Sequence, residues 1–236
     1  GTYTDTWTFT DSTGNYNNAS GTVEDSIAKA TPVLKWSNPA SIISGTALSG
    51  TQLNATATGV NGLSLPGAFT YTPGAGTVLP VGVQKLSVSF APNDSVDYVS
   101  PVSTSVSINV VYGVCPLIPQ NPPSAIKSGA TYPIKLYLCD TNGNDVSSSA
   151  IVVHATQVFL TSTVTGTPDD AGNSNPDLDF RYDSTLGPSG GYIYNLQTKG
   201  LPSGTWTMLF GAGYNASSGT YSDPANATHT IQFGVK

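Results

Sequence analysis

Acidic residues concentrate in one short stretch of this chain. Residues 169–183, DDAGNSNPDLDFRYD, hold five of the fourteen carboxylates among 236 residues. Calcium takes six to eight oxygen ligands from Asp, Asn, backbone carbonyls and water, and a bound cation relieves the repulsion between clustered carboxylates. One interpretation is therefore a calcium loop. Its ligands would be Asp169, Asp170, Asn173, Asn175, Asp177 and Asp179.

The other interpretation is a solvated loop between two strands, with Arg181 paired to a neighbouring Asp. An EF-hand does not fit, because the alignment puts Leu178 where Gly is required and Ser184 where the bidentate Glu belongs. Both interpretations stay open, and calcium is the only cofactor that the sequence suggests. A second loop, DTNGND at 140–145, also resembles a cation loop, but its Asn-Gly between two strand patterns favours a plain hairpin.

Residues suited to catalysis are few. His154 and His229 lie in strand-like segments, which favours packed or edge histidines over a general base. Asp177 and Asp179 are too close along one strand to serve as the acid and base of a glycosidase. The G-x-S-x-G pattern of hydrolases is absent. We therefore expect a protein that is not an enzyme.

The aromatic residues suggest either a core or a sugar-binding face. Tyr192 and Tyr194 share one face of a strand, so they are the best candidates for an exposed platform. Trp7, Trp36 and Trp206 could contribute to such a surface. In β-sandwiches, however, large aromatic side chains usually belong to the core. The core interpretation is favoured, and the platform stays as the alternative.

Composition limits the compartment and the partners. Only 9% of residues are charged, against about 25% in an average soluble protein, and Ser, Thr, Gly and Asn supply the polarity instead. The net charge of −6 offers no basic stripe to a nucleic acid. No apolar run approaches the length of about 18 residues that a membrane span needs. Cys115 and Cys139 favour one disulfide, formed in an oxidising compartment such as the cell exterior, over two free thiols.

Strand signals dominate the chain. Apolar and polar residues alternate in 2–10, 84–90, 103–111, 133–139 and 228–235, and a period of two predicts half-buried strands. Gly, Pro, Asn and Asp clusters separate these segments, as expected for turns. A helical period is missing. The sequence predicts an all-β protein.

An internal repeat organises the first half. Residues 1–27 run parallel to residues 82–108, so that Gly1 matches Gly82, Trp7 matches Val88 and Phe9 matches Phe90. Tyr16 falls one residue out of step with Tyr98. We therefore interpret residues 1–30 as the closing strands of an incomplete unit.

The complete copy is residues 31–111, and a Pro-rich passage then leads into a third domain, 112–236. The complete copy shows short strand patterns near 33–36, 41–43, 52–58, 67–72, 77–79, 83–91 and 103–111. That number in about 80 residues is typical of an immunoglobulin (Ig)-like sandwich.

A family resemblance rests on these segments. TPVLKWSNPASIISGTALSGTQLNATATG and the passage from GAFTYTPGAG to NDSVDYVS resemble bacterial Ig-like repeats of the MBG/YDG type, found in large secreted surface proteins. GTYTDTWTFTDSTGNYNNASGTVEDSIAKA resembles the tail of a related repeat, and the last domain is similar to a C-terminal β module that closes such arrays. The resemblance implies tandem Ig-like β-sandwiches without catalytic residues.

The predicted function follows from this organisation. We expect a structural or adhesive segment of a bacterial surface protein, secreted or displayed at the cell surface. The alternatives are a filament subunit assembled by strand addition through residues 1–30, or a terminal module that binds a carbohydrate or surface. Expected partners are other copies, neighbouring Ig-like repeats or a surface glycan. Because the alternating strand at 2–10 needs cover on one face, residues 1–29 should pack on another chain or on an upstream half rather than on residues 115–236.

Overall fold

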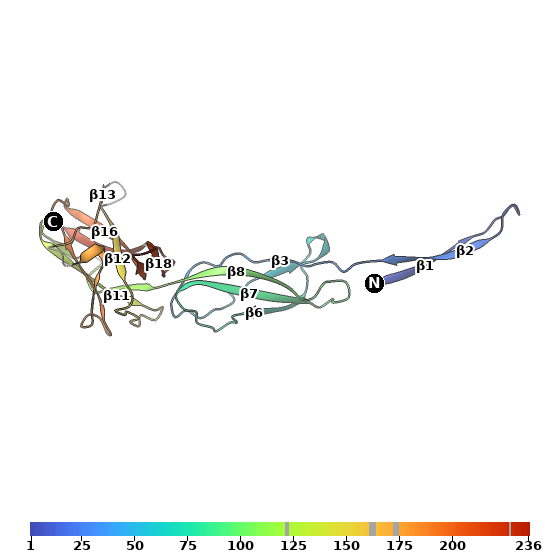
Figure 1. Ribbon diagram of the computed structural model, residues 1–236, viewed down its shortest axis with the longest axis horizontal. Coiled ribbons are helices and arrows are strands. Elements are labelled where there is room, and N and C mark those ends of the chain that lie inside the picture. The colour runs from blue at the N-terminus through green and yellow to red at the C-terminus, as the bar shows by residue number, and fades with distance from the viewer. Residues whose placement is uncertain (121–122, 161–163, 172–174, 227) are drawn as a thin grey trace. The chain divides into compact units, whose positions relative to one another are not determined.

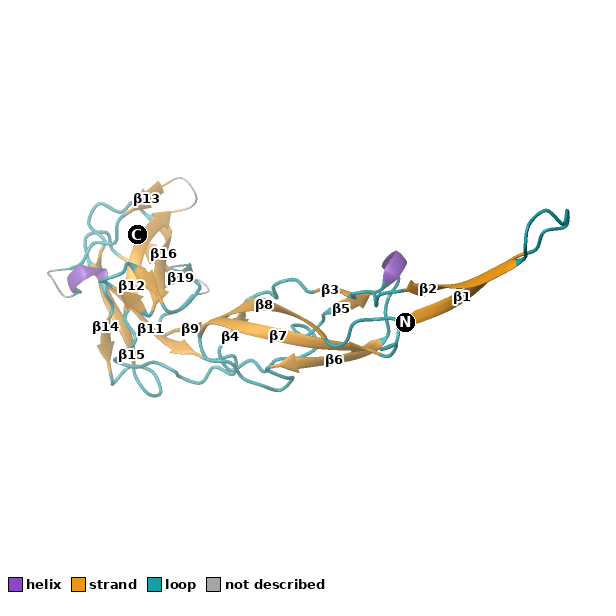
Figure 2. Ribbon diagram, turned by 45° about the vertical axis from the view of Figure 1, so that its right-hand side comes forward, coloured by secondary structure: helices purple, strands orange, loops and turns teal. Residues whose placement is uncertain are grey.

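A computed structural model describes residues 1–120, 123–160, 164–171, 175–226 and 228–236 (Figure 1). The regular structure in these ranges consists of β-strands and two single turns of 3₁₀-helix, η1 (Val60–Gly62) and η2 (Pro176–Leu178), coloured purple in Figure 2. Neither turn has the length or hydropathy of a membrane span. The protein is all-β and built from Ig-like β-sandwiches, which confirms the predicted fold class.

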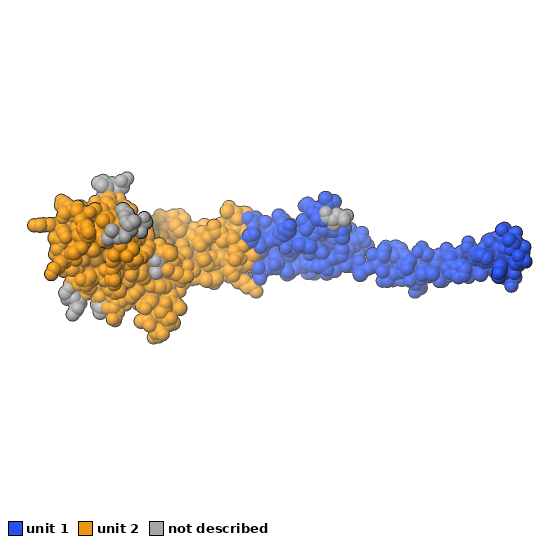
Figure 3. Space-filling model, turned by 90° about the horizontal axis from the view of Figure 1, so that it is seen from above, with its two compact units in different colours: residues 1–37, 54–73, 87–105 blue, residues 38–53, 74–86, 106–236 orange. Residues whose placement is uncertain are grey.

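The chain divides into two compact units (Figure 3). The first contains residues 1–37, 54–73 and 87–105, and the second contains residues 38–53, 74–86 and 106–236. This division does not test the domain boundaries expected after residues 30 and 111, which stay a prediction.

The first unit begins with a two-stranded antiparallel hairpin. Its strands are β1 (Thr2–Phe9) and β2 (Ala19–Ser26), drawn in blue in Figure 1. They pair along their full length, from Thr2 opposite Ser26 to Phe9 opposite Ala19. No third strand joins this sheet in the described part of the chain. Residues 1–30, predicted to be a half-unit, thus contain two paired strands.

Two sheets form the middle repeat. The smaller sheet pairs β3 (Val33–Lys35) with β5 (Thr56–Thr58). The larger has the order β4-β8-β7-β6, with the strands β4 (Ile42–Ile43), β6 (Gly67–Thr72), β7 (Gly82–Pro92) and β8 (Val102–Val111). The alternation of β7 places Leu86, Val88 and Phe90 in the interior. Strand structure in the expected segments 52–58 and 77–79 is shorter than predicted, since the second contains only a bridge at Val78.

The last domain is a sandwich of two larger sheets. One has the order β14-β15-β11-β9 and the other β10-β19-β16-β12-β13. Their strands are β9 (Gly113–Pro116), β10 (Ala125–Ile126), β11 (Thr131–Cys139), β12 (Val153–Leu160), β13 (Val164–Gly166), β14 (Arg181–Asp183), β15 (Gly191–Gln197), β16 (Gly204–Ala212) and β19 (His229–Val235). A small ribbon of β17 (Tyr214–Asn215) and β18 (Thr220–Tyr221) accompanies them.

The core of this sandwich is formed by every second residue along its strands, the residues that face inward. Ile134, Leu136 and Leu138 of β11 face inward, and so do Trp206 and Met208 of β16. The same period of two that identified the strands therefore also selected the core.

Candidate functional site

One face of the N-terminal hairpin carries large apolar side chains that remain exposed. Residues opposite one another in an antiparallel pair share a face, and the register places Tyr3, Trp7 and Phe9 beside Val23 and Ile27. We call this side of the hairpin the open face. All five side chains are exposed, and Trp7 and Phe9 are each 48% exposed. The opposite side consists mainly of threonines and serines.

The hairpin has little to hold it together by itself. An isolated two-stranded ribbon is marginally stable in water, and its outer edges present unpaired backbone groups. Within the open face, the ring of Trp7 lies against Gly21, where an added Cβ would come within 2.8 Å of the indole. This contact covers only part of the indole, so the face remains suited to binding another surface.

A hollow of about 540 Å³ lies at the base of the hairpin, within the same unit. Tyr3 and Ile27 line it from the hairpin, and Val60, Val96 and Tyr98 line it from the middle repeat. Val60 and Val96 are exposed. The apolar surface of the open face thus continues onto the next repeat.

The aspartates of the acidic stretch, residues 169–183, have different surroundings and partners. Asp170 Oδ2 accepts a hydrogen bond from the Asn175 amide at 2.7 Å, and Asp179 Oδ1 lies 2.6 Å from Nδ1 of His154. Asp177 is exposed, in left-handed backbone with φ 58°. Asp169 is also exposed, and its carbonyl accepts the amide of Gln197. Asn173 lies outside the described residues.

Asn175 is buried, and its side chain forms hydrogen bonds to three backbone groups. Its Nδ2 donates to the carbonyls of Asp179 and Ile193, both at 3.0 Å, and its Oδ1 accepts the amide of Asn195 at 2.8 Å. Its side-chain oxygen is therefore committed to the backbone of β15. In the described part of the chain, no three His, Cys, Asp or Glu side chains gather as metal ligands. The calcium prediction is not tested by this geometry, but the side chains of three of its residues, Asp170, Asn175 and Asp179, already have partners inside the protein.

Tyr192 and Tyr194 are fully buried, so the alternative of an exposed sugar-binding platform is wrong for these residues. The physical reason is the position of β15 between β14 and β11, with Tyr192 and Tyr194 facing the opposite sheet. Burial raises the pKa of Tyr192 to about 12. It also raises the pKa of Tyr194, with nearby Asp170 adding to the shift.

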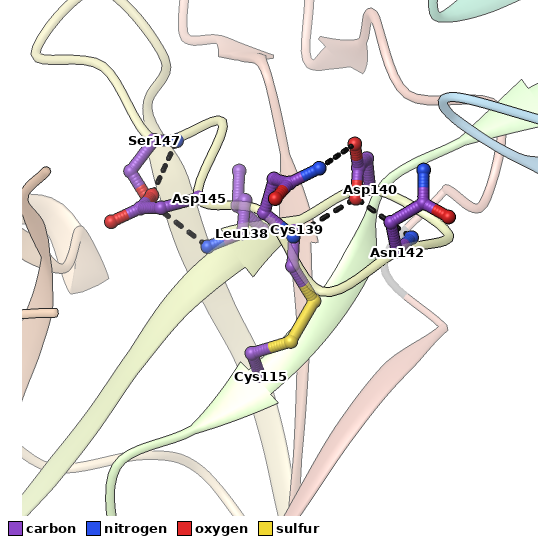
Figure 4. The surroundings of a disulfide bond; sticks show 8 residues. Cys115, Leu138, Cys139, Asp140, Asn142, Asp145 and Ser147 are labelled. Atoms are coloured by element: carbon purple, nitrogen blue, oxygen red, sulfur yellow. Dashed lines mark hydrogen bonds between the residues drawn. A yellow bond between two sulfur atoms is a disulfide. The ribbon is translucent and has the colours of Figure 1, made fainter. Parts of the chain in front are cut away.

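Cys115 and Cys139 form the predicted disulfide, which joins β9 to the end of β11 (Figure 4). The hairpin predicted at 140–145 follows immediately. Asp140 Oδ1 accepts the amides of Asn142 and Asn144. Gly143 adopts a φ of 81°, which suits glycine. The carboxylate of Asp140 thus holds the turn.

One buried cluster of polar groups, around Asp223, was not predicted from the sequence. Asp223 is fully buried, and its Oδ2 lies 2.8 Å from Nε2 of His229 and accepts the backbone amide of Tyr112 at 2.9 Å. Burial raises the pKa of Tyr112, and Asp223 adds to the effect. Tyr112 is the residue between β8 and β9. Because Asp223 follows it by 111 positions, no local pattern in the sequence could have indicated this contact.

Comparisons with known proteins give matches among solved structures. No protein-family model and no curated protein matches the chain. A three-domain Ig segment of titin, in an E-to-A variant, covers 100% of this chain and 74% of its own at 9% identity, with a TM-score of 0.29. Domains 4–9 of the surface-layer protein SbsC cover 94% of this chain and 34% of their own at 13% identity, with a TM-score of 0.27. Ig domains 1–5 of Sidekick-1 cover 100% and 45% at 10% identity, with a TM-score of 0.24.

Proposed function

We propose that this chain is a non-catalytic structural segment of an extracellular array of Ig-like sandwiches, and that it carries tension between neighbouring units. The observation that supports this most directly is one shared pairing. In the middle repeat and in the last sandwich, an early strand lies parallel to the last strand. Ile42 and Ile43 of β4 pair with Val110 and Val111 of β8, and β10 pairs in the same way with the end of β19.

Parallel pairing of this kind suits resistance to pulling. When a chain is pulled through its two ends, an early strand and the last strand are drawn in opposite directions along their shared edge. Their hydrogen bonds then bear the load together, whereas a hairpin pulled at its open end loses them one at a time. Ser44 extends the pairing of the middle repeat by donating its amide to the carbonyl of Val111 at 2.8 Å.

The connection between the middle repeat and the last sandwich is short. Tyr112 alone separates β8 from β9, and its amide is held by the buried carboxylate of Asp223. The amide of Thr141 also donates to the carbonyl of Ser44 at 2.8 Å. Short, hydrogen-bonded connections pass load from one sandwich to the next without first extending a flexible linker.

Compartment and partners follow the same proposal. The disulfide suits secretion or display at the cell surface, and a bacterial surface array would supply neighbouring Ig-like repeats as partners. An adhesive role belongs to the same class of protein. The carbohydrate-binding alternative loses its named residues, since Tyr192 and Tyr194 are buried.

Single-molecule pulling on the full chain, with handles at both ends, tests the proposal. Replacing Ser44 by Pro removes the amide that bonds to Val111, so we expect a lower unfolding force for the middle repeat. Ser44→Ala keeps this amide and is the matched control. Forced unfolding depends on the barrier rather than on equilibrium stability, so Val88→Ala, which weakens the buried core, is the second control.

The proposal requires that Ser44→Pro lower the unfolding force more than Val88→Ala does at equal loss of equilibrium stability. If the forces of both variants follow their equilibrium stabilities alone, the parallel pairing has no mechanical role and the proposal fails.

A further inference from the structure

The middle repeat contains a strand that matches β1 of the open face in sequence but has its apolar side chains buried. Along β1, Asp5, Trp7 and Phe9 alternate with threonines, and along β7 the buried Leu86, Val88 and Phe90 occupy the matching positions. The match follows from the internal repeat that pairs Gly1 with Gly82. What covers β7 and its loop therefore indicates what should cover β1.

The first covering element is a strand. In the middle repeat, β6 lies antiparallel to β7 on the edge away from β8, with Phe69 opposite Phe90. The two rings pack with their centroids 4.6 Å apart. The corresponding edge of β1 carries no strand in the described part of the chain. Its cover should supply an antiparallel strand with an apolar or aromatic residue opposite Phe9.

The second covering element lies at the loop. Tyr98 accepts the amide of Val60 on its hydroxyl at 3.2 Å, and its ring lies so close to Gly59 that a Cβ there would clash with it. Tyr16, the matching residue, is 75% exposed. A cover should therefore also bring a glycine and a bare backbone amide to Tyr16. Both elements come from the opening half of an Ig-like unit.

One residue argues against the chain's own opening half as this cover. Asp5 stands where the middle repeat has Leu86, which is 0% exposed. Asp25 lies on the same face, opposite Tyr3, and neither β1 nor β2 contains Lys or Arg. Among the side chains described in residues 31–81, the buried ones are apolar apart from Gln52. Such a cover would bury the Asp5 carboxylate without a cation, which is strongly unfavourable.

We propose that the open face binds the opening half of a different Ig-like unit, one that places a cation or several hydrogen-bond donors against Asp5. This inference rests on the proposed function, because it names a partner that the open face binds within the array. Asp5 then acts as a specificity residue. It disfavours pairing with the chain's own repeat and rewards a partner that neutralises it.

A second copy of this chain fits the open face less well. The opening half of a copy is already paired with its own β7 and β8. Two open faces packed together would each bury roughly 500 Å², if five half-exposed side chains contribute about 100 Å² each. A stable interface of standard size buries about 800 Å² per partner. Self-association is therefore an outcome that the experiment must be able to detect.

The experiment supplies an opening half in cis. Residues 31–81 are fused directly before Gly1 of the full chain, which reproduces the natural junction of residues 81 and 82. The comparison includes the unfused chain, the fusion, the fusion with Asp5→Leu and the fusion with Asp5→Leu and Phe9→Ala. Hydrogen exchange of residues 2–9 and the emission of Trp7 report on cover, and exchange in the last sandwich verifies folding of each protein.

We expect Asp5→Leu to slow exchange across β1 on the order of 100-fold in the fusion and to shift Trp7 emission to the blue. The fusion with Asp5 retained should gain less than about 10-fold, and Phe9→Ala should reverse much of the gain. Three results would overturn the proposal. The first is equal protection of β1 in the fusions with and without Asp5→Leu, which would mean that the aspartate does not discriminate between covers.

The second is concentration-dependent protection of Trp7 in the unfused chain, which would identify a second copy as the partner. The third is absence of protection in every fusion, which would reject an Ig-like opening half as the occupant. Because no force is applied, each of these failures is separate from a failure of the load-bearing function.

Discussion

The N-terminal hairpin and the last sandwich are made of strands with the same alternating pattern, yet their side chains have opposite surroundings. Trp7 of β1 is 48% exposed, whereas Trp206 of β16 is 1% exposed. β1 has one neighbouring strand, while β16 lies between β12 and β19 and faces a second sheet. An alternating pattern therefore specifies which face needs cover, but the cover itself comes from other parts of a sandwich.

The same contrast extends to polar groups. In the hairpin, Asp5 is exposed to solvent, because its face is open. In the last sandwich, Asp223 is buried and engaged by His229 and by the amide of Tyr112. A carboxylate can enter a β-sandwich core when donors are arranged around it. The described hairpin places no such donors around Asp5. The groups that its cover brings therefore decide whether this carboxylate can be buried.

The largest difference in stability should come from truncating the buried Trp206 of the last sandwich, compared with the exposed Trp7 of the hairpin. Trp206→Ala removes a buried indole whose Nε1 donates to the carbonyl of Pro202, so the last sandwich should lose about 3–5 kcal/mol of unfolding free energy. Trp7→Ala should cost at most about 1 kcal/mol, the range of a cross-strand contact. Urea unfolding resolved by regional hydrogen exchange measures both. Comparable losses at the two sites would mean that the open face is in fact covered.

The second effect concerns the covalent link that the last sandwich has and the hairpin lacks. Replacing Cys115 and Cys139 by Ser should destabilise the last sandwich by about 3 kcal/mol and leave exchange in the hairpin unchanged. Under pulling, the loop between the cysteines, with a sequence separation of 24, should add roughly 80 Å of extended chain. A variant that keeps the melting temperature and the extension of the parent would contradict a structural role for this bond.

Much of this architecture could be predicted from the sequence because it depends on local patterns. Alternation located the strands around 84–90 and 133–139, and Asn-Gly located the turn after Cys139. The internal repeat predicted that residues 1–30 are a half-unit, and these residues form the hairpin of β1 and β2. These features arise from neighbouring residues, whose periodicity and turn chemistry can be read directly.

What could not be predicted depends on long-range packing. Tyr192 and Tyr194 lie in the core, as the favoured interpretation had it, but that interpretation came from the usual place of aromatic residues in β-sandwiches, since alternation alone does not say which face is the inner one. The roles of Asp179 and Asn175 were also hidden. One pairs with His154 and the other clamps the backbone of β15, and such contacts exist only once both sheets are assembled.

A third, smaller effect tests the calcium prediction for the acidic stretch. We expect the melting temperature of the last sandwich to be the same in chelator and in about 5 mM calcium, near the weak end of extracellular sites. The reason is that Asp179 and Asn175 already have protein partners. A rise of several degrees, as expected for a ligand well above its dissociation constant, would instead establish the site. Asp170→Asn and Asp177→Asn should then remove that rise while leaving the melting temperature in chelator nearly unchanged.

The smallest effect compares two exposed turns, each held by one aspartate. In the hairpin loop, Asp11 accepts the hydroxyl and amide of Thr13 and the amide of Tyr16. The Thr13 side chain is the main cause that lowers the pKa of Asp11 to about 2, followed by these amides. In the last sandwich, the pKa of Asp140 is also lowered, chiefly by the side chain of Asn144.

Both turns should therefore be fully ordered above the ordinary pKa of an aspartate, about 4, and should loosen only at more acidic pH. For Asp11, a folded pKa below the unfolded one means that the charged form favours the turn, so this contribution disappears as the pH falls through about 2. Thr13→Ala should raise the pKa of Asp11 and leave that of Asp140 unchanged, measured by NMR titration of the carboxyl carbons. If Asp11 titrates at the ordinary value in the parent protein, its loop is not held by these hydrogen bonds, and the hairpin would be less ordered at its tip than the turn at Asp140.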